Sequence, residues 1–174
     1  NLVGTLDEGW PVTEHMLERA IVLLCAQHLG AARQQAEMAI EYAKNRVAFG
    51  RPIGAYQAIA HTCADLITWV DGGELLTFEA LWRMDQGLPA TIEVSQAKAF
   101  CNEKLMVLGR LANAIHGGIA FIEEFNLTLW FRRVEAMAMR LGTSREHRAR
   151  VADAILDQPG HVELGKDLYN LAVS

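Results

Sequence analysis

The chain has 174 residues, of which 51% are hydrophobic and 21% are charged, an ordinary mixture for one globular domain with a single core. Its net charge of −5 and the absence of a polybasic run exclude a protein that binds nucleic-acid phosphates or anionic membrane surfaces. We therefore expect a small molecule or another protein as its partner.

Hydrophobic periodicity predicts a first helix from Thr13 to about Phe49. Thr13 is expected to be its N-cap and Glu14 an acid in its first turn. The apolar face repeats through Leu17, Ile21, Leu24, Cys25 and His28. Pro52 and Gly54 are expected to form the turn that follows this helix.

A second amphipathic helix is predicted after this turn, ending near Gly87 because Leu88 and Pro89 block its continuation. Its apolar stripe consists of Ile59, Cys63, Leu66, Ile67 and Val70. A third helix is predicted from about Ile92 to the glycine pair at 117 and 118. Its inward residues are Leu105, Leu108, Ala112 and Ile115.

Thr143 and Glu146 form a capping box that starts the last helix. A segment of about two dozen residues, which includes Trp130 and Phe131, separates it from the third helix. Long helices joined by short turns specify an all-α, up-down helical bundle over residues 1–157. Residues 158–174 are expected to be a C-terminal tail.

The sequence offers no metal site. A di-iron bundle requires a glutamate three residues before a histidine, and no such pair occurs, nor does an HExxH motif or a Walker loop. The four tryptophans and six methionines are expected in the core. So are Cys25, Cys63 and Cys101, which lie in no CxxC or CxxH motif and suit a reducing compartment.

A cytoplasmic location is the default expectation, because the sequence shows no signal peptide and no apolar stretch long enough to span a bilayer. The chain begins with Asn1 rather than Met, which indicates a fragment, a trimmed chain or a processed product.

The segment from 42 to 59 has the layout of a corner that binds phosphates and rings. Arg46 offers a forked guanidinium suited to a pyrophosphate, and Phe49 offers a flat face for a ring. Gly50 supplies a left-handed residue that stops the helix, and Gln57 opens the next helix. Plain helix capping by a basic residue and a glycine explains the same pattern equally simply.

The paired glycines Gly117 and Gly118 expose backbone amides that no side chain obstructs, which suits close approach to a ligand. The neighbouring His116 either faces a ligand or caps the helix end. Glu123 and Glu124 are expected to be solvated rather than catalytic, because adjacent helical residues point about 100° apart. Arg132 is expected to pair with such acids or with a neighbouring subunit, as is Arg133.

Three motifs in one order resemble the C-terminal helical domain of the acyl-CoA dehydrogenases: Arg46–Gly50 with Gln57, then Gly117–Gly118, then Gly142–Ser144. The resemblance covers about residues 10–157 without a gap. It implies FAD as cofactor, which takes a hydride from the β carbon of an acyl-CoA while a glutamate removes the α proton.

The resemblance also implies site residues and partners. Residues that would meet the adenosine and pyrophosphate of a neighbouring subunit's FAD are Arg46, Phe49, Gln57, Gly117 and Gly118. Thr143 would lie near the flavin of its own subunit. The implied assembly is a homo- or hetero-oligomer, a dimer or tetramer, with an electron-transfer flavoprotein or similar protein as electron acceptor.

The sequence departs from the family pattern at the catalytic base. Leu141 occupies the usual position of the glutamate, and Ala20 occupies the position that a second family solution uses. Glu18 is the nearest carboxylate to Ala20, but two residues are about 200° around a helix. Ala114 replaces the family glutamine near the glycine pair. The catalytic base is therefore unassigned.

Two functions follow from this pattern. The chain is a domain of a working acyl-CoA dehydrogenase, of the branch that acts on steroid side chains or other bulky acyl-CoAs and shares a site with a partner subunit. Alternatively, it is a non-catalytic helical assembly subunit that completes a partner's flavin site. In either case we expect these residues alone to fold into helices without dehydrogenating a substrate.

Overall fold

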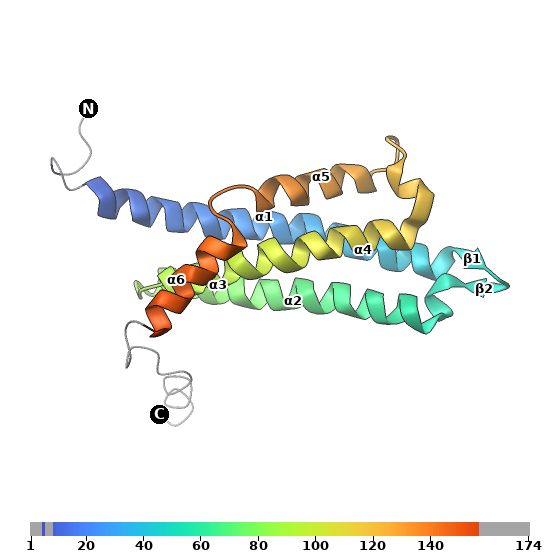
Figure 1. Ribbon diagram of the computed structural model, residues 1–174, viewed down its shortest axis with the longest axis horizontal. Helices are drawn as coiled ribbons and strands as arrows, with labels where there is room; N and C mark the ends of the chain where they lie inside the picture. Colours follow the sequence, from blue (N-terminus) through green and yellow to red (C-terminus); the bar gives the residue numbers. More distant parts are fainter. Residues whose placement is uncertain (1–4, 6–8, 157–174) are drawn as a thin grey trace, which may run out of the picture.

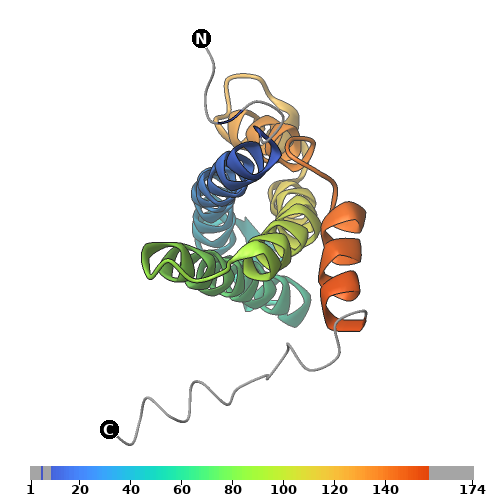
Figure 2. The same ribbon diagram turned by 90° about the vertical axis from the view of Figure 1, so that its left-hand side faces the viewer.

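The computed structural model describes Thr5 and residues 9–156, which form a long helical bundle (Figure 1). The predicted tail at 158–174 lies outside the described residues. The helices are α1 (Gly9–Asn45), α2 (Gln57–Asp85), α3 (Thr91–Phe100), α4 (Met106–His116), α5 (Leu127–Ala138) and α6 (Ser144–Leu156). Successive long segments alternate in direction along the bundle, which confirms the all-α, up-down fold (Figure 1). Viewed end-on, α6 lies outside the bundle, where it packs against α3 (Figure 2).

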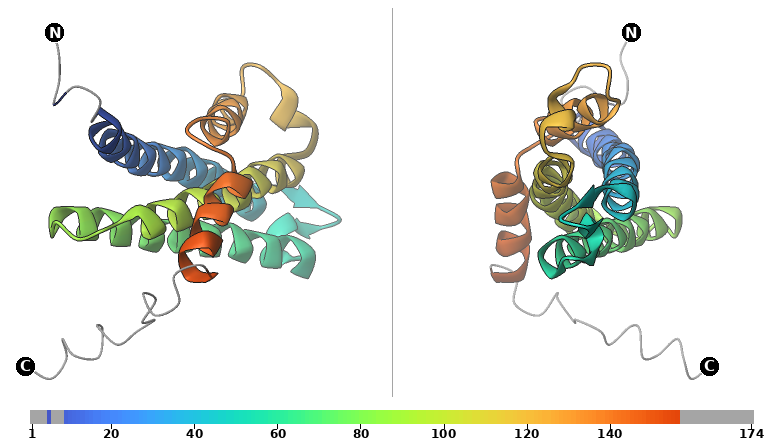
Figure 3. Two further views of the ribbon diagram at one scale, coloured as in Figure 1. Left: turned by 60° about the vertical axis from the view of Figure 1, so that its left-hand side comes forward. Right: turned by 90° about the vertical axis from the view of Figure 1, so that its right-hand side faces the viewer.

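α1 is longer at its start and shorter at its end than the sequence suggests. The helix already includes Thr13, whose hydroxyl donates to the carbonyl of Gly9 four residues earlier (3.0 Å), so the predicted N-cap is wrong. It ends at Asn45 rather than Phe49, because Val47–Ala48 (β1) pairs antiparallel with Arg51–Pro52 (β2). This two-stranded hairpin forms the tip of the bundle (Figure 3).

The hairpin turn consists of Phe49 and Gly50, both with positive φ (52° and 82°). Gly50 therefore has the predicted left-handed backbone, but it closes a hairpin instead of ending a helix. Pro52 lies in β2, and Gly54 lies in the short 3-10 helix η1 (Ile53–Ala55), so the predicted turn at these two residues is also wrong. The α2 helix then starts at Gln57.

The third predicted helix is interrupted by a π-helical segment. Five residues, Cys101–Leu105, form a π-helical segment (η2) between α3 and α4. π-Turns are rare and occur often at functional sites. After it, Leu108, Ala112 and Ile115 are buried as predicted. Further on, the 3-10 helix η3 (Gly117–Phe121) and α5 occupy the segment for which the sequence suggested no helix.

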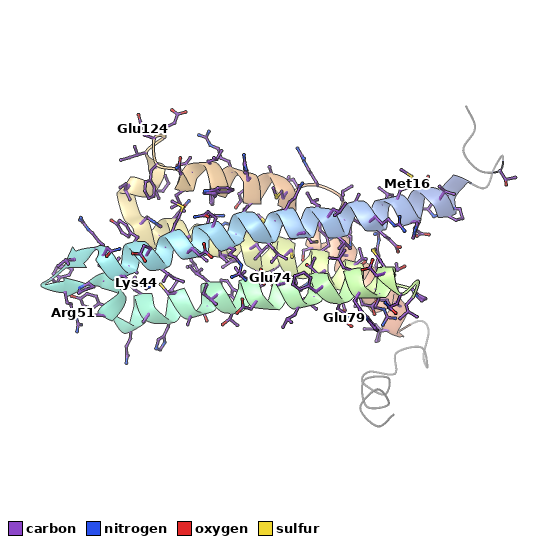
Figure 4. All side chains as sticks on the ribbon, turned by 180° about the vertical axis from the view of Figure 1, so that it is seen from behind. Met16, Lys44, Arg51, Glu74, Glu79 and Glu124 are labelled. Atoms are coloured by element: carbon purple, nitrogen blue, oxygen red, sulfur yellow. The ribbon has the colours of Figure 1, made fainter. Side chains whose placement is uncertain are left out.

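The core lies where α1, α2, α3 and α4 meet, and it includes Leu29, Leu66 and Leu105. The expectation for the aromatic and sulfur residues holds only in part, since Trp10 and Met16 on α1 and Trp82 on α2 are more than half exposed. Figure 4 places Met16 near the N-terminal end of α1, beyond the other helices.

Among the buried polar residues are His28, which the sequence placed on the apolar face of the first helix, and Lys98. His28 is fully buried, and neither ring nitrogen has a hydrogen-bond partner. Lys98 is fully buried as well, and its Nζ donates to the Met137 carbonyl on α5 (3.0 Å). Burial lowers the pKa of both side chains, that of His28 to about 3.

None of the helices within the described part of the chain is both long enough and apolar enough to cross a membrane.

Candidate functional site

Five exposed residues of the predicted site lie at the hairpin end of the bundle, and we call this set the cofactor corner: Arg46, Phe49, Gln57, Gly117 and Gly118. Arg46 directly follows α1, and its exposed guanidinium has no ion-pair or hydrogen-bond partner within residues 9–156. Its backbone carbonyl accepts from Ile53 N (2.8 Å), which ties it to η1. Phe49 projects from the hairpin turn with 96% of its surface exposed.

An aromatic stack brings the glycine turn to the end of α1. The ring of His116 lies on that of Tyr42, four residues before Arg46, with 4.6 Å between the ring centroids. Its Nδ1 donates to the Ala112 carbonyl (2.7 Å), and Phe125 packs at an angle against its other side. Burial lowers the pKa of His116, so the neutral ring is favoured. His116 therefore positions the turn rather than facing outward.

The cofactor corner fits the group that the resemblance implies. Gly117 has φ 66°, and a methyl group added at Gly117 or Gly118 would meet no atom within 4 Å, so the backbone there is open to a ligand. Gln57 is exposed in the first turn of α2, at the positive end of the helix dipole. An unpaired guanidinium, a free aromatic face and an open backbone turn are suited to a pyrophosphate and an adenine ring.

The second region that the resemblance places near the flavin is the loop from Leu141 to Thr143, between α5 and α6. Thr143 caps α6 as predicted, since its hydroxyl accepts from Glu146 N (3.3 Å) while the Glu146 carboxylate accepts from Thr143 N (2.7 Å). These bonds hold the pKa of Glu146 below its usual value. Thr143 thus has a structural role besides any contact with a flavin.

Two buried polar side chains donate hydrogen bonds to the backbone of the same loop. His147 is fully buried, and its Nε2 donates to the Leu141 carbonyl (2.8 Å) while Ser95 lies at its Nδ1 (3.3 Å). Asn102, in the π-helical segment, donates to the Gly142 carbonyl (3.1 Å). The backbone of this loop is therefore fixed before any ligand binds.

Gly142→Ala is expected to lower the free energy of unfolding by about 1–3 kcal/mol. Gly142 has φ 99°, and an added Cβ would lie 2.6 Å from the buried His147 ring. Urea titration of both forms checks this expectation. Gly30→Ala is the matched control, because an added Cβ meets nothing there within 4 Å, and a gain of about 0.5–1 kcal/mol is expected within a helix. Equal effects of the two variants would contradict the strain argument.

The loop opens onto a groove between α1 and α5, which we call the α1 groove. It consists of two adjoining hollows of about 560 and 570 Å³ that share Gln27 and Arg140. One hollow contains both Ala20 and Leu141 in its wall, so the two positions where the family carries a glutamate converge on one place. No carboxylate lines either hollow in the part of the chain that the structure describes.

Glu18 does not line the α1 groove. Its carboxylate accepts a hydrogen bond from the hydroxyl of Thr91, the first residue of α3. Its assignment as the base stays a prediction, and the structure gives it a different contact.

The cofactor corner is far from the end of the α1 groove that contains Ala20 and Leu141. From Ala20 to Asn45, α1 rises about 37 Å at about 1.5 Å per residue. Thr143 and Leu141 are therefore not brought together with Arg46 and its neighbours (Figure 1). That these two regions contact two different cofactors stays a prediction.

The fold and these two regions define an all-α bundle with an exposed guanidinium and an open glycine turn at one end, and a mostly apolar groove along α1. The family model described as "Acyl-CoA dehydrogenase, C-terminal domain" matches residues 7–156. The chain belongs to this family.

Individual relatives are similar over most of the chain. A 3-(aryl)acrylate reductase of Clostridium sporogenes is 32% identical over 156 residues, which are 90% of this chain and 41% of the relative. Acyl-CoA dehydrogenase IpdE2 of Mycolicibacterium smegmatis is 33% identical over 136 residues, 78% of this chain and 42% of the relative. The chain thus spans about two fifths of the length of these relatives.

A solved structure of an acyl-CoA dehydrogenase has the same fold over most of this chain. The butyryl-CoA dehydrogenase of Megasphaera elsdenii superposes with a TM-score of 0.86 at 26% identity, covering 90% of this chain and 41% of that one.

The sequence predictions missed Gln27 and Arg140 in the groove and the two anchors of the loop, His147 and Asn102. His147 lies only four residues after Thr143, so the capping box was the available signal for it. Nothing in the sequence pattern pointed to Gln27 or Arg140, because both lie on a groove that only the packing of α5 on α1 creates.

Proposed function

We propose that this chain is the C-terminal, FAD-contacting and oligomerising domain of a flavin-dependent acyl-CoA dehydrogenase, which forms the α,β double bond of an acyl-CoA thioester. The cofactor corner carries the proposal, because an unpaired cation, a free aromatic face and an open glycine turn all lie at the same end of the bundle. When bound, FAD supplies the acceptor for the hydride. The activity belongs to the longer parent protein and not to these residues alone.

Each residue of the corner has a binding task. Arg46 would donate to a pyrophosphate through its forked guanidinium. Phe49 would offer its ring to the adenine, and Gly117 and Gly118 would offer their amides to the adenosine. Gln57 adds a polar contact beside the positive end of α2.

The distance along α1 supports an oligomer. Ala20, which lines the same hollow as Leu141, lies about 37 Å along α1 from the corner, so we infer that the corner and the Thr143 loop serve different cofactors. We infer a dimer or tetramer, of identical or different subunits, in which each FAD contacts two subunits. We include an electron-transfer flavoprotein or similar acceptor among the partners, supported by similarity to the caffeyl-CoA reductase–Etf complex subunit CarC of Acetobacterium woodii. A cytoplasmic location belongs to the same proposal.

The second candidate function is a non-catalytic assembly subunit that completes a partner's flavin site. The observation that favours it is the α1 groove, where Leu141 and Ala20 stand at both family positions of the glutamate. In that case a partner subunit supplies the base.

Arg46→Ala in the parent protein tests the corner. Loss of a charge-assisted contact to a pyrophosphate is expected to weaken FAD binding about 10- to 150-fold with little change in unfolding temperature. Flavin occupancy and FAD titration measure the effect. Lys44→Ala is the control, because Lys44 is a nearby exposed cation that pairs with Glu41 (3.8 Å; Figure 4). Equal FAD affinity in wild type and Arg46→Ala would show that Arg46 is only a helix cap.

A further inference from the structure

The α1 groove extends well beyond the position of the catalytic base. From Ala20 to Gly30 it follows α1 for about 15 Å at about 1.5 Å per residue. Apolar side chains such as Leu24 and Met137 form most of its wall. Such a surface suits an extended or polycyclic hydrocarbon rather than a small polar ligand.

Two arginines bring positive charge into this apolar groove. Arg140 lies where the two hollows join, and Arg133 lies in the hollow farther from Leu141. Neither pairs with an acid among residues 9–156.

Arg133 is also held in place. Its guanidinium lies over the ring of Trp130, with 5.2 Å between Cζ and the ring centroid. Trp130 lines the same hollow, so the stack holds the cation at the far end of the groove. A positioned guanidinium without a carboxylate partner is suited to bind a planar anion.

We propose that the acyl group of the substrate carries a carboxylate at the end opposite to the thioester, and that Arg133 binds this carboxylate. This inference rests on the proposed function, because it takes the thioester to lie beside Leu141 and Ala20. The length of the groove along α1 sets an upper limit on the length of the acyl group. About 15 Å corresponds to about twelve bonds of extended chain at about 1.2 Å per bond. A linear dicarboxylic acyl group of about twelve carbons, or a ring system of equal length, spans the groove.

The experiment uses the complete parent protein with its FAD and any partner subunit. The measured quantity is the ratio of kcat/KM for dodecanedioyl-CoA to that for dodecanoyl-CoA, which differ only at the far end. Arg133→Gln is expected to lower this ratio about 10- to 100-fold, because one charge-assisted contact is lost. Calorimetry with the two corresponding 2-enoyl products measures the ratio of their Kd values, which tests the same contact without turnover.

The adjacent Arg132→Gln is the matched control, since Arg132 is exposed on the same helix but does not line the groove. It is expected to leave the ratio unchanged. Hexanedioyl-CoA, which is too short to reach Arg133, is expected to show no preference over hexanoyl-CoA. A ratio that Arg133→Gln leaves unchanged, or a preference that is largest for hexanedioyl-CoA, overturns the inference while the proposed function stands. A parent protein that binds FAD but turns over no acyl-CoA overturns both.

Discussion

Leu141→Glu in the parent protein, expressed without a partner, is expected to accelerate anaerobic bleaching of its flavin by acyl-CoA about 10²- to 10⁴-fold. This range is what a correctly placed general base contributes. The side chain at 141 faces the hollow that also contains Ala20, and no carboxylate lines that hollow within the described residues. In the wild-type parent protein without a partner, the flavin is therefore expected to bleach slowly. Stopped-flow absorbance with a panel of acyl-CoAs measures the rates of both proteins.

Leu141→Gln is the matched control, because glutamine has the shape of glutamate but cannot accept the proton. Co-expression with a partner subunit tests whether the base comes from elsewhere, and Glu18→Gln tests the remaining candidate in this chain. Rapid bleaching by the lone wild-type chain that survives Glu18→Gln would show that neither position explains the base. Equal rates for the glutamate and glutamine variants would contradict the importance of position 141.

The chain is expected to lose stability steeply in acid because of His28. Its pKa is about 3 in the folded chain, mainly through burial and secondarily through the charge of Lys98, against about 6.5 when unfolded. The depressed pKa means that the unfolded state binds the proton first, so stability is complete above pH 6.5 and falls between pH 6.5 and 3. The loss attributable to His28 is about 2 kcal/mol at pH 5 and approaches about 5 kcal/mol near pH 3.

Urea titrations at pH 7, 5 and 4 measure this effect. His28→Leu is expected to remove it, and to cost little at pH 7, because both ring nitrogens of His28 are buried without a partner. His61→Leu, an exposed histidine on α2, is the control and is expected to keep the wild-type pH dependence. If the stability of His28→Leu falls between pH 7 and 4 as steeply as that of wild type, His28 is not the acid-sensitive group.

The long helices could be predicted from the sequence because their apolar residues repeat with the helical period, as the burial of Leu108, Ala112 and Ile115 shows. The hairpin could not, since two-residue strands have no period, and Gly50 marks a left-handed backbone in a hairpin as well as at a helix end. The helix α5 escaped prediction even though its buried Leu127, Val134 and Ala138 repeat on one face.

The corner residues of the candidate site could be proposed from the sequence because their motifs are local. Arg46, Phe49 and Gln57 lie within a dozen residues of one another along the chain. The α1 groove depends instead on α5 packing against α1, so Arg133 and Gln27 became neighbours only in the folded chain. The buried Lys98 is a related case, because a lysine in a periodic pattern normally indicates a solvated face.

The anchoring of the loop at residues 141–143 has an evolutionary consequence. His147 and Asn102 hold backbone carbonyls, and Glu146 holds Thr143, so none of these bonds uses the side chain of residue 141. A substitution at that position alone can therefore introduce or remove a carboxylate without remodelling the loop. After gene duplication, one copy could keep the base and the other could lose it, and two divided subunits would then depend on each other.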